Sequence, residues 1–371
     1  MSVKWNYIRF GNLFDYENKS KIKAGDGLES GSYPFYTSSV ELTKFIDQFQ
    51  FDKTSLIFGT GGNASIHYCD KPFSVSTDCL VAFAKDETKV YPKYVFYYLS
   101  GNINLLEEGF KGAGLKHISK GYINDIQIPL PPLATQKRIA EILDTADALR
   151  RKDQELLKKY DELAQAIFID MFGDPTKNEK GWDVKTIGSI TKVGSGSTPS
   201  RQIPSYFKGN IPWVKTTEVN GKIINSTEEL ISDEALENSS CKIYPENSVI
   251  IAMYGQGKTR GQVALLGIEA ATNQACGVIL PCSSLNPKFL FNYLKFSYNN
   301  LRNLGRGGNQ ENLNKGMIED YLLMIPPIVL QLEFNQRLDI LLKQETILNV
   351  FKSESLFNSL LQKAFKGELV S

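Results

Sequence analysis

Long hydrophobic runs are missing from this chain, and their absence excludes one large class of protein. No apolar stretch approaches the roughly 20 residues that a membrane-spanning helix needs. The first residues, Met-Ser-Val-Lys-Trp-Asn, also lack the apolar core of a signal peptide. We therefore expect a cytoplasmic protein that has no membrane partner.

Cysteine and histidine are both scarce, which argues against several kinds of catalytic or metal centre. The five cysteines are odd in number and show no C-x-x-C spacing, a pattern typical of reduced thiols in a cytosol-like compartment. The only two histidines, His67 and His117, lie on separate segments. We therefore expect no metal site and no catalytic histidine.

A basic excess is also missing. The chain has 42 Lys and Arg against 41 Asp and Glu, which gives a formal net charge of +1. Even residues 173–327 hold only 16 basic groups against 14 acidic ones. Proteins that bind nucleic acid often carry a clear basic excess. Any DNA-binding surface here must therefore be a local patch, and we expect its acidic partners to face elsewhere.

What the chain does contain is a long internal repeat. The segment from Lys120 to Gln136 returns from Lys315 to Gln331. Lys, Gly, Ile, Asp, two adjacent prolines and Gln match between the copies at one constant offset, 315 − 120 = 195. A period of this length is far beyond a solenoid unit, so it indicates a duplicated domain together with its own helix.

Two long helices are expected, one after each half. Residues 135–172 contain no Pro and no Gly, and their apolar residues recur at steps of three and four. The predicted core positions are Ile139, Ile142, Ala146, Leu149, Asp153, Leu156, Tyr160, Leu163 and Ile167. Eight of these nine are apolar or aromatic, which is typical of a coiled-coil seam. Residues 330–366 carry a less regular version, and we expect the two helices to pair antiparallel.

The rest of the chain consists of short runs rich in Tyr, Phe, Val and Ile, separated by Gly, Asn, Asp and Pro. Residues 55–58 and 78–83 are expected strands, matched by 248–252 and 276–280, and a helix should begin at Pro92. The predicted fold class is α+β: two strand-rich mixed α/β domains joined by two long antiparallel coiled-coil helices, with an internal pseudo-two-fold repeat. We expect the domains at 1–133 and 174–327 and the helices at 134–173 and 328–371.

Several of these features recur together in one known family. They are the Pro-Pro-x-x-x-Gln helix start, which occurs twice, the similar domain openings at Trp5 and Trp182, Ile211-Pro-Trp213, and Leu-Leu-Gln-Lys-Ala-Phe-Lys-Gly-Glu-Leu at 360–369. In this the chain resembles, over nearly its whole length, the DNA-specificity subunit of type I restriction–modification systems. The resemblance implies two target-recognition domains, each reading one half of a split, asymmetric DNA site, on helices that space them.

The same resemblance implies the partners. Double-stranded DNA, methyltransferase (modification) subunits docked on the helices and a motor–nuclease (restriction) subunit are expected. The specificity subunit of this family performs no chemistry. We therefore expect no cofactor on this chain, and S-adenosylmethionine, ATP and Mg²⁺ on the partner subunits.

Two motifs come close to nucleotide or cofactor signatures. Residues 250–259 nearly spell a P-loop, but Ala252 replaces its first glycine, and residues 260–266 favour a strand where a P-loop needs a helix. Phe58-Gly-Thr-Gly61 is similar to a methyltransferase cofactor loop, but the Pro-Pro pairs lack the flanking residues of a base-amine site. Two alternatives to DNA recognition are a nucleotide-dependent enzyme and a bivalent protein–protein scaffold. The neutral net charge slightly favours the scaffold.

Polar and basic residues on loops at matching places in the two halves are the predicted DNA contacts. Arg pairs with guanine and Asn or Gln with adenine, whereas Lys and backbone amides on glycine turns hold phosphate. Singly these residues fit a solvated loop equally well, but as groups they favour contact. In the first half they are Tyr36, Thr37, Ser38, Thr60, Asn63, Lys111, Lys116 and His117. In the second they are Lys215, Thr216, Thr217, Tyr254, Gln256, Lys258, Arg260, Arg302, Arg306, Asn309 and Gln310.

Overall fold

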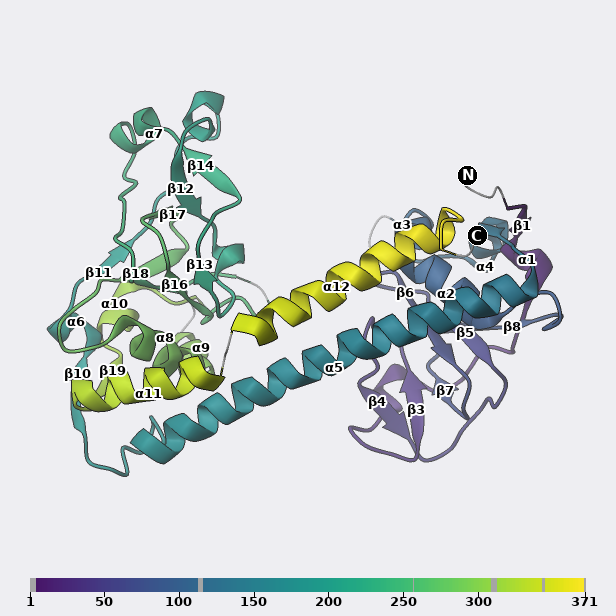
Figure 1. Cartoon of the computed structure of the whole chain (residues 1–371), viewed down its shortest axis with the longest axis horizontal. Coiled ribbons are helices and arrows are strands. Elements are labelled where there is room, and N and C mark those ends of the chain that lie inside the picture. The colour runs from purple at the N-terminus through teal and green to yellow at the C-terminus, as the bar shows by residue number, and fades with distance from the viewer. Residues whose placement is uncertain (1–4, 113–115, 256, 308–311, 342–343, 370–371) are drawn as a thin grey trace. The chain divides into compact units, whose positions relative to one another are not determined.

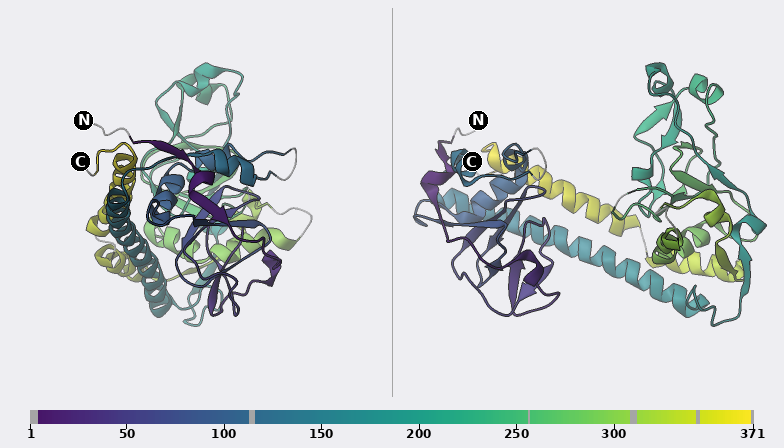
Figure 2. Two further views of the ribbon diagram at one scale, coloured as in Figure 1. Left: turned by 90° about the vertical axis from the view of Figure 1, so that its right-hand side faces the viewer. Right: turned by 180° about the vertical axis from the view of Figure 1, so that it is seen from behind.

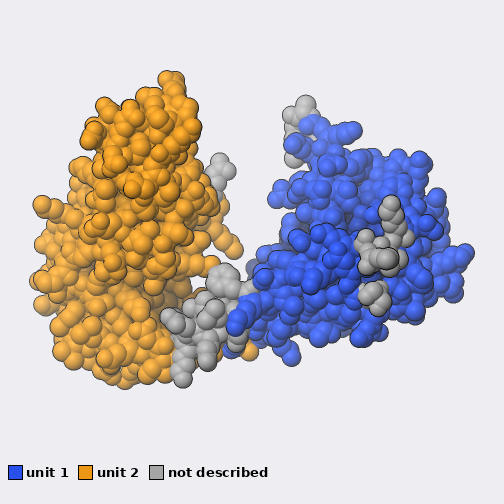
Figure 3. All heavy atoms as spheres, turned by 45° about the horizontal axis from the view of Figure 1, so that its top comes forward, with its two compact units in different colours: residues 1–156, 345–371 blue, residues 157–344 orange. Residues whose placement is uncertain are grey.

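The computed structural model describes residues 5–112, 116–255, 257–307, 312–341 and 344–369. The chain divides into two compact units, one formed by residues 1–156 with 345–371 and the other by residues 157–344 (Figure 3). The first unit is thus assembled from two separate stretches of chain. Within the described ranges, no helix combines the length and the apolar character that a membrane crossing requires.

The first unit is built around an antiparallel sheet of order β2-β8-β5-β6. A smaller sheet has the order β4-β3-β7, in which β3 pairs antiparallel with β4 and parallel with β7. β1 pairs with β9. The strands are β1 (Tyr7–Arg9), β2 (Phe14–Tyr16), β3 (Tyr33–Tyr36), β4 (Lys44–Ile46), β5 (Ser55–Gly59), β6 (Ser65–Cys69), β7 (Ser74–Val75), β8 (Cys79–Ala84) and β9 (Gln127–Pro129). The helices include α1 (Phe10–Leu13), α2 (Pro92–Gly101), α3 (Asn104–Glu107) and α4 (Lys120–Asp125).

The second unit repeats this plan, which confirms the predicted duplication. Its larger sheet has the order β11-β18-β15-β16-β13, and its smaller sheet the order β14-β12-β17, again with one antiparallel and one parallel pair. The strands are β10 (Asp183–Thr186), β11 (Val193–Ser195), β12 (Ile211–Val214), β13 (Ile223–Ile224), β14 (Glu229–Ile231), β15 (Val249–Ala252), β16 (Val263–Leu266), β17 (Ala271–Thr272), β18 (Cys276–Ile279) and β19 (Leu322–Ile325), which pairs with β10. The helices include α6 (Ile187–Ile190), α7 (Asp233–Glu237), α8 (Pro287–Phe296), α9 (Tyr298–Asn303) and α10 (Lys315–Glu319).

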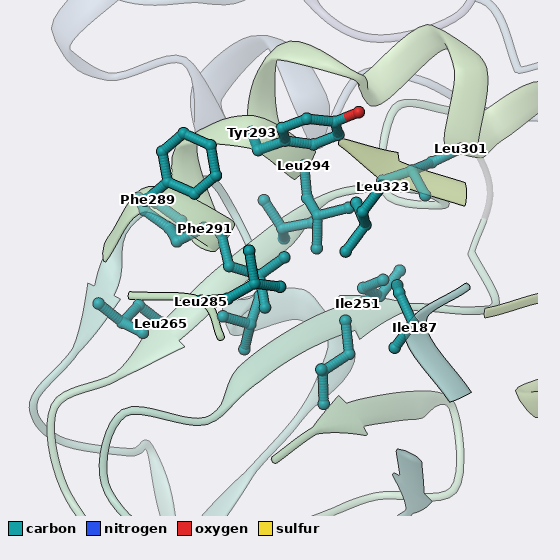
Figure 4. Close-up of a cluster of buried hydrophobic side chains, with 14 of the residues drawn as sticks. Ile187, Ile251, Leu265, Leu285, Phe289, Phe291, Tyr293, Leu294, Leu301 and Leu323 are labelled. Atoms are coloured by element: carbon teal, nitrogen blue, oxygen red, sulfur yellow. The ribbon is translucent and has the colours of Figure 1, made fainter. Parts of the chain in front are cut away.

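The core of the second unit forms where the larger sheet meets α8 (Figure 4). Ile251 of β15 and Leu265 of β16 pack with Phe289 and Tyr293 of α8 and with Leu323 of β19, and all five side chains are at most 5% exposed. Burial of each such side chain contributes roughly 1.5–3 kcal/mol. The continuous apolar runs from which strands were predicted therefore supply side chains to this core.

The repeated Pro-Pro-x-x-x-Gln motif has a physical explanation. Gln136 is fully buried, accepts a hydrogen bond from the amide of Tyr91 (2.8 Å) and donates to the carbonyls of Lys89 (2.9 Å) and Pro131 (2.8 Å). Tyr91 precedes the first turn of α2, so this glutamine ties the start of α2 to the start of the long helix. Gln331 makes the corresponding bonds in the second unit, to the amide of Asn286 and the carbonyls of Ser284 and Pro326.

The first long helix, α5, runs from Leu133 to Phe172. It ends at Gly173, whose φ of 82° is readily adopted only by glycine and whose amide caps the carbonyl of Ile169 (2.8 Å). The second helical segment consists of α11 (Ile328–Leu341) and α12 (Gln344–Phe365), and residues 342–343 lie outside the described residues.

The helices pair antiparallel, as predicted. In the first unit α12 lies beside the N-terminal half of α5 (Figure 1 and Figure 2), and Arg150 of α5 forms an ion pair with Glu354 of α12 (3.4 Å). In the second unit Phe168 of α5 packs edge-on against Phe334 of α11, with ring centroids 5.5 Å apart. Together with the two strand-rich units, this confirms the predicted fold class.

The seam of α5 differs from the prediction. Ile139 and Ala146 are buried, but Leu149, Leu156 and Leu163 are 47%, 40% and 47% exposed. The predicted positions Ile142, Asp153, Tyr160 and Ile167 are half-buried. Leu143, Arg150, Leu157, Ala164 and Phe168, which were not predicted, are also buried or half-buried. The helix carries two apolar rows, and only packing against its neighbours selects the row that turns inward.

Candidate nucleic-acid interface

In the first unit, predicted contact residues converge where β3 and β5 end. The hydroxyl of Ser38, after β3, donates to the carbonyl of Asp78 (2.6 Å) and accepts from the amide of Gly61 (3.3 Å). Thr60, after β5, donates to the same carbonyl through its amide (2.8 Å) and its hydroxyl (2.9 Å). One carbonyl oxygen therefore fixes two loops against each other and orders the glycine turn that follows Thr60.

The loop with Lys111, Lys116 and His117 closes on the same turn. The amide of Ile118 donates to the carbonyl of Thr60 (3.1 Å), and His117 Nδ1 lies 3.1 Å from that oxygen. Lys111 and His117 exchange two backbone hydrogen bonds of 3.1 Å. The side chains of Lys111, Lys116 and His117 are exposed, as is that of Asn63 on the turn itself. This places two lysines, a histidine and an asparagine at one edge of the unit.

In the second unit, the glycine turn after β15 packs against α9. The hydroxyl of Tyr298 donates to the carbonyl of Lys258 (2.8 Å), and Arg302 Nη1 donates to that hydroxyl (2.9 Å). Gly261 has φ +85°, and a Cβ added there would lie 3.3 Å from the backbone nitrogen of Arg302. Glycine is therefore required at this position, both for the backbone conformation and for the close approach of α9. The side chain of Lys258 remains exposed.

The two turns occupy equivalent positions. In the second unit the amide of Leu313 donates to the carbonyl of Met253 (3.0 Å), which matches the bond from Ile118 to Thr60 at offsets of 195 and 193. The residues that follow, Ser119 and Asn314, each cap a short helix through a side-chain oxygen. The structure thus brings a glycine turn and the residues that lead into a short helix together at matching edges of both units.

Lys215 follows β12 and lies in a cluster of ion pairs. Its Nζ is 2.6 Å from Glu228 and 3.2 Å from Glu229, and Glu229 also pairs with Arg201 (2.6 Å). Hydrogen bonds to Glu228 and then Glu229 raise the pKa of Lys215. The expectation that acidic partners face away from the site is therefore wrong here, because two carboxylates lie beside a predicted phosphate contact.

Three predicted contacts are buried, which corrects the prediction for them. Tyr36 is 7% exposed and packs edge-on against Phe73. Thr216 is 8% exposed, and its hydroxyl donates to Oδ1 of Asn273 (2.9 Å). Arg260 is 7% exposed. Each occupies a loop by sequence, but its side chain turns into the unit and offers no surface to DNA.

Among the other predicted contacts, some are exposed or half-buried and some lie outside the described residues. Thr217 is exposed, Tyr254 is 40% exposed and Thr37 is half-buried. Arg306 falls in a short 3₁₀ helix, Leu304–Gly307, of which only the backbone is described at this position. Gln256, Asn309 and Gln310 lie outside the described residues.

The structure adds Gln274 and Tyr298 to the candidate surface. Gln274 is exposed on the connection between β17 and β18, and the hydroxyl of Thr198 donates to its Oε1. Cys276 and Cys79 begin matching strands, at an offset of 276 − 79 = 197, so this connection corresponds to residues 76–78 of the first half. A comparison of the two halves could therefore have identified Gln274 as a candidate. Tyr298 begins a helix, and no local pattern indicates that its hydroxyl bridges the turn and Arg302.

The segment that nearly spells a P-loop does not have the structure of one. Val263–Leu266, which follow the glycine turn, form strand β16 as predicted, and a P-loop would need a helix there. Among the described residues, no group of three or more His, Cys, Asp or Glu could hold a metal ion. The residues gathered at the two turns are hydrogen-bond donors and cations, which suits them to bind phosphate and base edges.

Comparisons with known proteins agree with these observations. A family model described as the type I restriction modification DNA specificity domain matches residues 2–159 and 179–355. The chain is 28% identical over 308 residues to the type I restriction enzyme MjaIX specificity subunit of Methanocaldococcus jannaschii, covering 76% of this chain and 69% of that protein. It is 25% identical over 374 residues to the EcoR124I/EcoR124II specificity subunit of Escherichia coli, covering 94% and 88%.

A solved structure supports the fold. The crystal structure of the S subunit of a type I restriction–modification system from M. genitalium matches with a TM-score of 0.61, covering 97% of this chain and 96% of that chain. Sequence identity over the match is 15%, so this likeness concerns the fold alone.

Proposed function

Because this chain belongs to the type I restriction–modification DNA specificity family, we propose that it recognises a bipartite, asymmetric DNA sequence, one half through each unit. A specificity subunit recognises DNA and performs no catalysis of its own. The observation that carries the bipartite proposal is an equivalent backbone hydrogen bond in the two units, from Ile118 to Thr60 and from Leu313 to Met253, at the edge where each unit has its glycine turn. In the first unit the turn at 60–63 contacts His117, and in the second the turn at 257–261 packs against α9.

The residues at each turn divide into two roles. Lys116 and Lys258 are exposed cations suited to phosphate, which would position the unit without reading sequence. Asn63 and Arg302 carry the planar groups that pair with adenine and guanine. Glycine at the turns lets the backbone approach the duplex closely. Each unit therefore has what is needed both to hold DNA and to read a few base pairs.

An exchange of domains tests the bipartite reading. Residues 1–133 would be replaced by the corresponding domain of a relative, and the methylated motif would be sequenced in cells that also make the methyltransferase. We expect one half of the motif to change while the other half is kept. A motif in which both halves changed, or neither, would contradict independent reading by two units.

We also propose that the long helices set the spacing of the two half-sites. The 40 residues of α5 extend about 60 Å at 1.5 Å each, which corresponds to roughly 18 base pairs at 3.4 Å. One heptad inserted within residues 149–163, with another at the facing place in the second helical segment, should lengthen the spacer by about three base pairs. Both half-sites should stay the same. An unchanged spacer would exclude this role for the helices.

The exposed leucines on α5 support a proposal for subunit assembly. Leu149 and Leu156 lie seven residues apart and are 47% and 40% exposed, the spacing with which an apolar row meets another helix. We place the docking surface for methyltransferase subunits here, with S-adenosylmethionine, ATP and Mg²⁺ on the methyltransferase and restriction subunits. Replacing both leucines with lysine should abolish co-purification of the methyltransferase. Leu230→Lys on β14, also 40% exposed, is the control and should leave assembly intact.

A further inference from the structure

The ion pairs around Lys215 lie at the edge of the candidate DNA surface. The amide of Asn273 donates to the carbonyl of Val214 (3.0 Å), directly before Lys215. Two residues beyond Asn273, the carbonyl of Ala275 accepts from the amide of Met253 (2.8 Å), where the glycine turn begins. Lys215 is thus connected to the turn through the exposed loop that carries Gln274.

The two carboxylates that hold Lys215 are not equally fixed. Glu229 is also bound by Arg201, whose guanidinium lies over the rings of Phe207 (4.0 Å) and Trp213 (5.2 Å). The side chain of Glu228 is 66% exposed and forms an ion pair with Lys215. The backbone amide of Glu228 donates a hydrogen bond to the carboxylate of Glu218 (2.9 Å). Glu228 is therefore the partner that can leave Lys215 at the lower cost.

The first unit has different residues at these positions. Thr37 stands where the second unit has Lys215, at the strand offset 211 − 33 = 178. Lys44 faces Phe35 across the β3–β4 pair, as Glu229 faces Trp213 across the β12–β14 pair. The ion-pair cluster is therefore a property of the second unit and not of the shared frame.

We propose that Glu228 competes with DNA phosphate for Lys215 and so lowers the affinity of the second unit for DNA of every sequence. The inference rests on the proposed function. A phosphate that approaches Lys215 must compete with the carboxylate at 2.6 Å, and the carboxylate also repels the DNA backbone. Phosphate contacts carry no sequence information, so the effect is the same on specific and nonspecific DNA. Such competition limits nonspecific binding by a chain whose net charge is only +1.

The test uses Glu228→Gln in the full chain assembled with its methyltransferase subunits. Dissociation constants would be measured across salt concentrations for DNA with the methylated motif and for a scrambled duplex. We expect affinity for both duplexes to rise about three- to tenfold at 50 mM salt, and the slope of log K against log salt to steepen by up to about 0.9. Because Glu228 is exposed and glutamine is nearly isosteric, the melting temperature should not change.

A double-mutant cycle isolates the interaction. In the Lys215→Gln background, Glu228→Gln should have a smaller effect, because the cation that it would release is gone and only the loss of its repulsion toward DNA remains. Glu333→Gln, which breaks the exposed pair with Arg337 on α11 (2.8 Å), is the matched control and should bind DNA like the parent. If Glu228→Gln bound both duplexes like the parent at every salt concentration, the competition would be disproved while specific DNA binding stood. If the parent bound neither duplex, the proposed function would fall and the inference with it.

Discussion

In the first unit the glycine turn after β5 carries no lysine, whereas in the second the equivalent turn carries Lys258 and rests on Tyr298. The first unit supplies its cations from the neighbouring loop, through Lys111 and Lys116. The backbone bonds that join turn and loop are nevertheless equivalent in both. The strands and helices that the two units share therefore set where a side chain is displayed. The residues of the loops set its chemistry.

The frames of the two units differ much less. Lys93 pairs with Asp144 (2.8 Å) in the first unit, and Lys288 pairs with Asp339 (2.5 Å) in the second, both partners at the offset of 195. The hydrogen bonds of the buried Gln136 and Gln331, the two glutamine clamps, also match one for one between the units. A buried hydrogen bond is costly to lose because its partners stay behind without water, so the frame tolerates less change than the loops.

The largest expected effect is on stability, and it should be unequal between the units. Phe168 is fully buried among Phe172, Phe289 and Phe334, so Phe168→Ala should lower the free energy of unfolding of the second unit by about 3–5 kcal/mol. Phe365, its counterpart, is half-buried against two tyrosines, so Phe365→Ala should cost the first unit only roughly 1–2 kcal/mol. Urea unfolding monitored by hydrogen exchange would resolve the units. Equal losses would contradict the difference in packing.

The glutamine clamps should behave alike. Gln136→Ala and Gln331→Ala each leave an amide and two carbonyls without their partner, so each should destabilise its own unit by roughly 2–3 kcal/mol. Hydrogen exchange at the start of α2 or of α8 would report the loss. Gln336→Ala on the exposed face of α11 is the control and should change little. A loss in one unit only would show that the clamps are not equivalent.

A smaller effect is expected on DNA binding. Lys258→Ala and Lys116→Ala should each weaken binding to all sequences alike and reduce the slope of log K against log salt by about 0.9, if each lysine holds one phosphate. Titrations of specific and scrambled duplexes at several salt concentrations would measure both quantities. A loss confined to the specific duplex would mean that the lysine reads a base.

The smallest expected effect is a difference in pH response. Burial lowers the pKa of His67, partly offset by its hydrogen bond to the carbonyl of Ser39. The unfolded chain then binds the proton more tightly, so the stability of the first unit should fall as pH drops below about 6.5. The second unit contains no histidine and should not respond between about pH 5 and 6.5. His67→Gln should flatten the response of the first unit in the same assay, and an unchanged response would assign it to another group.

The duplication, the fold class and the positions of most elements could be predicted from local sequence patterns. The reason is local: Pro92 and Gly173 define helix ends through backbone geometry, and buried strands such as β5 require continuous apolar runs. The repeat at a constant offset needs no structure to be found. The exposed loops with Asn63, Lys116 and Lys258 were also predictable, because glycine and polar residues cluster there.

Which side chains those elements display depends on contacts that form when the chain folds. The inward row of α5 depends on α11 and α12, whose residues come more than 150 positions later. Tyr36 and Arg260 belong to loops by sequence and to the interior by packing. Lys215 meets Glu228 because β12 pairs with β14, so its charge is neutralised by a residue that its own neighbourhood in the sequence does not contain. Burial and ion pairing depend on contacts between distant residues, and local sequence patterns carry little information about them.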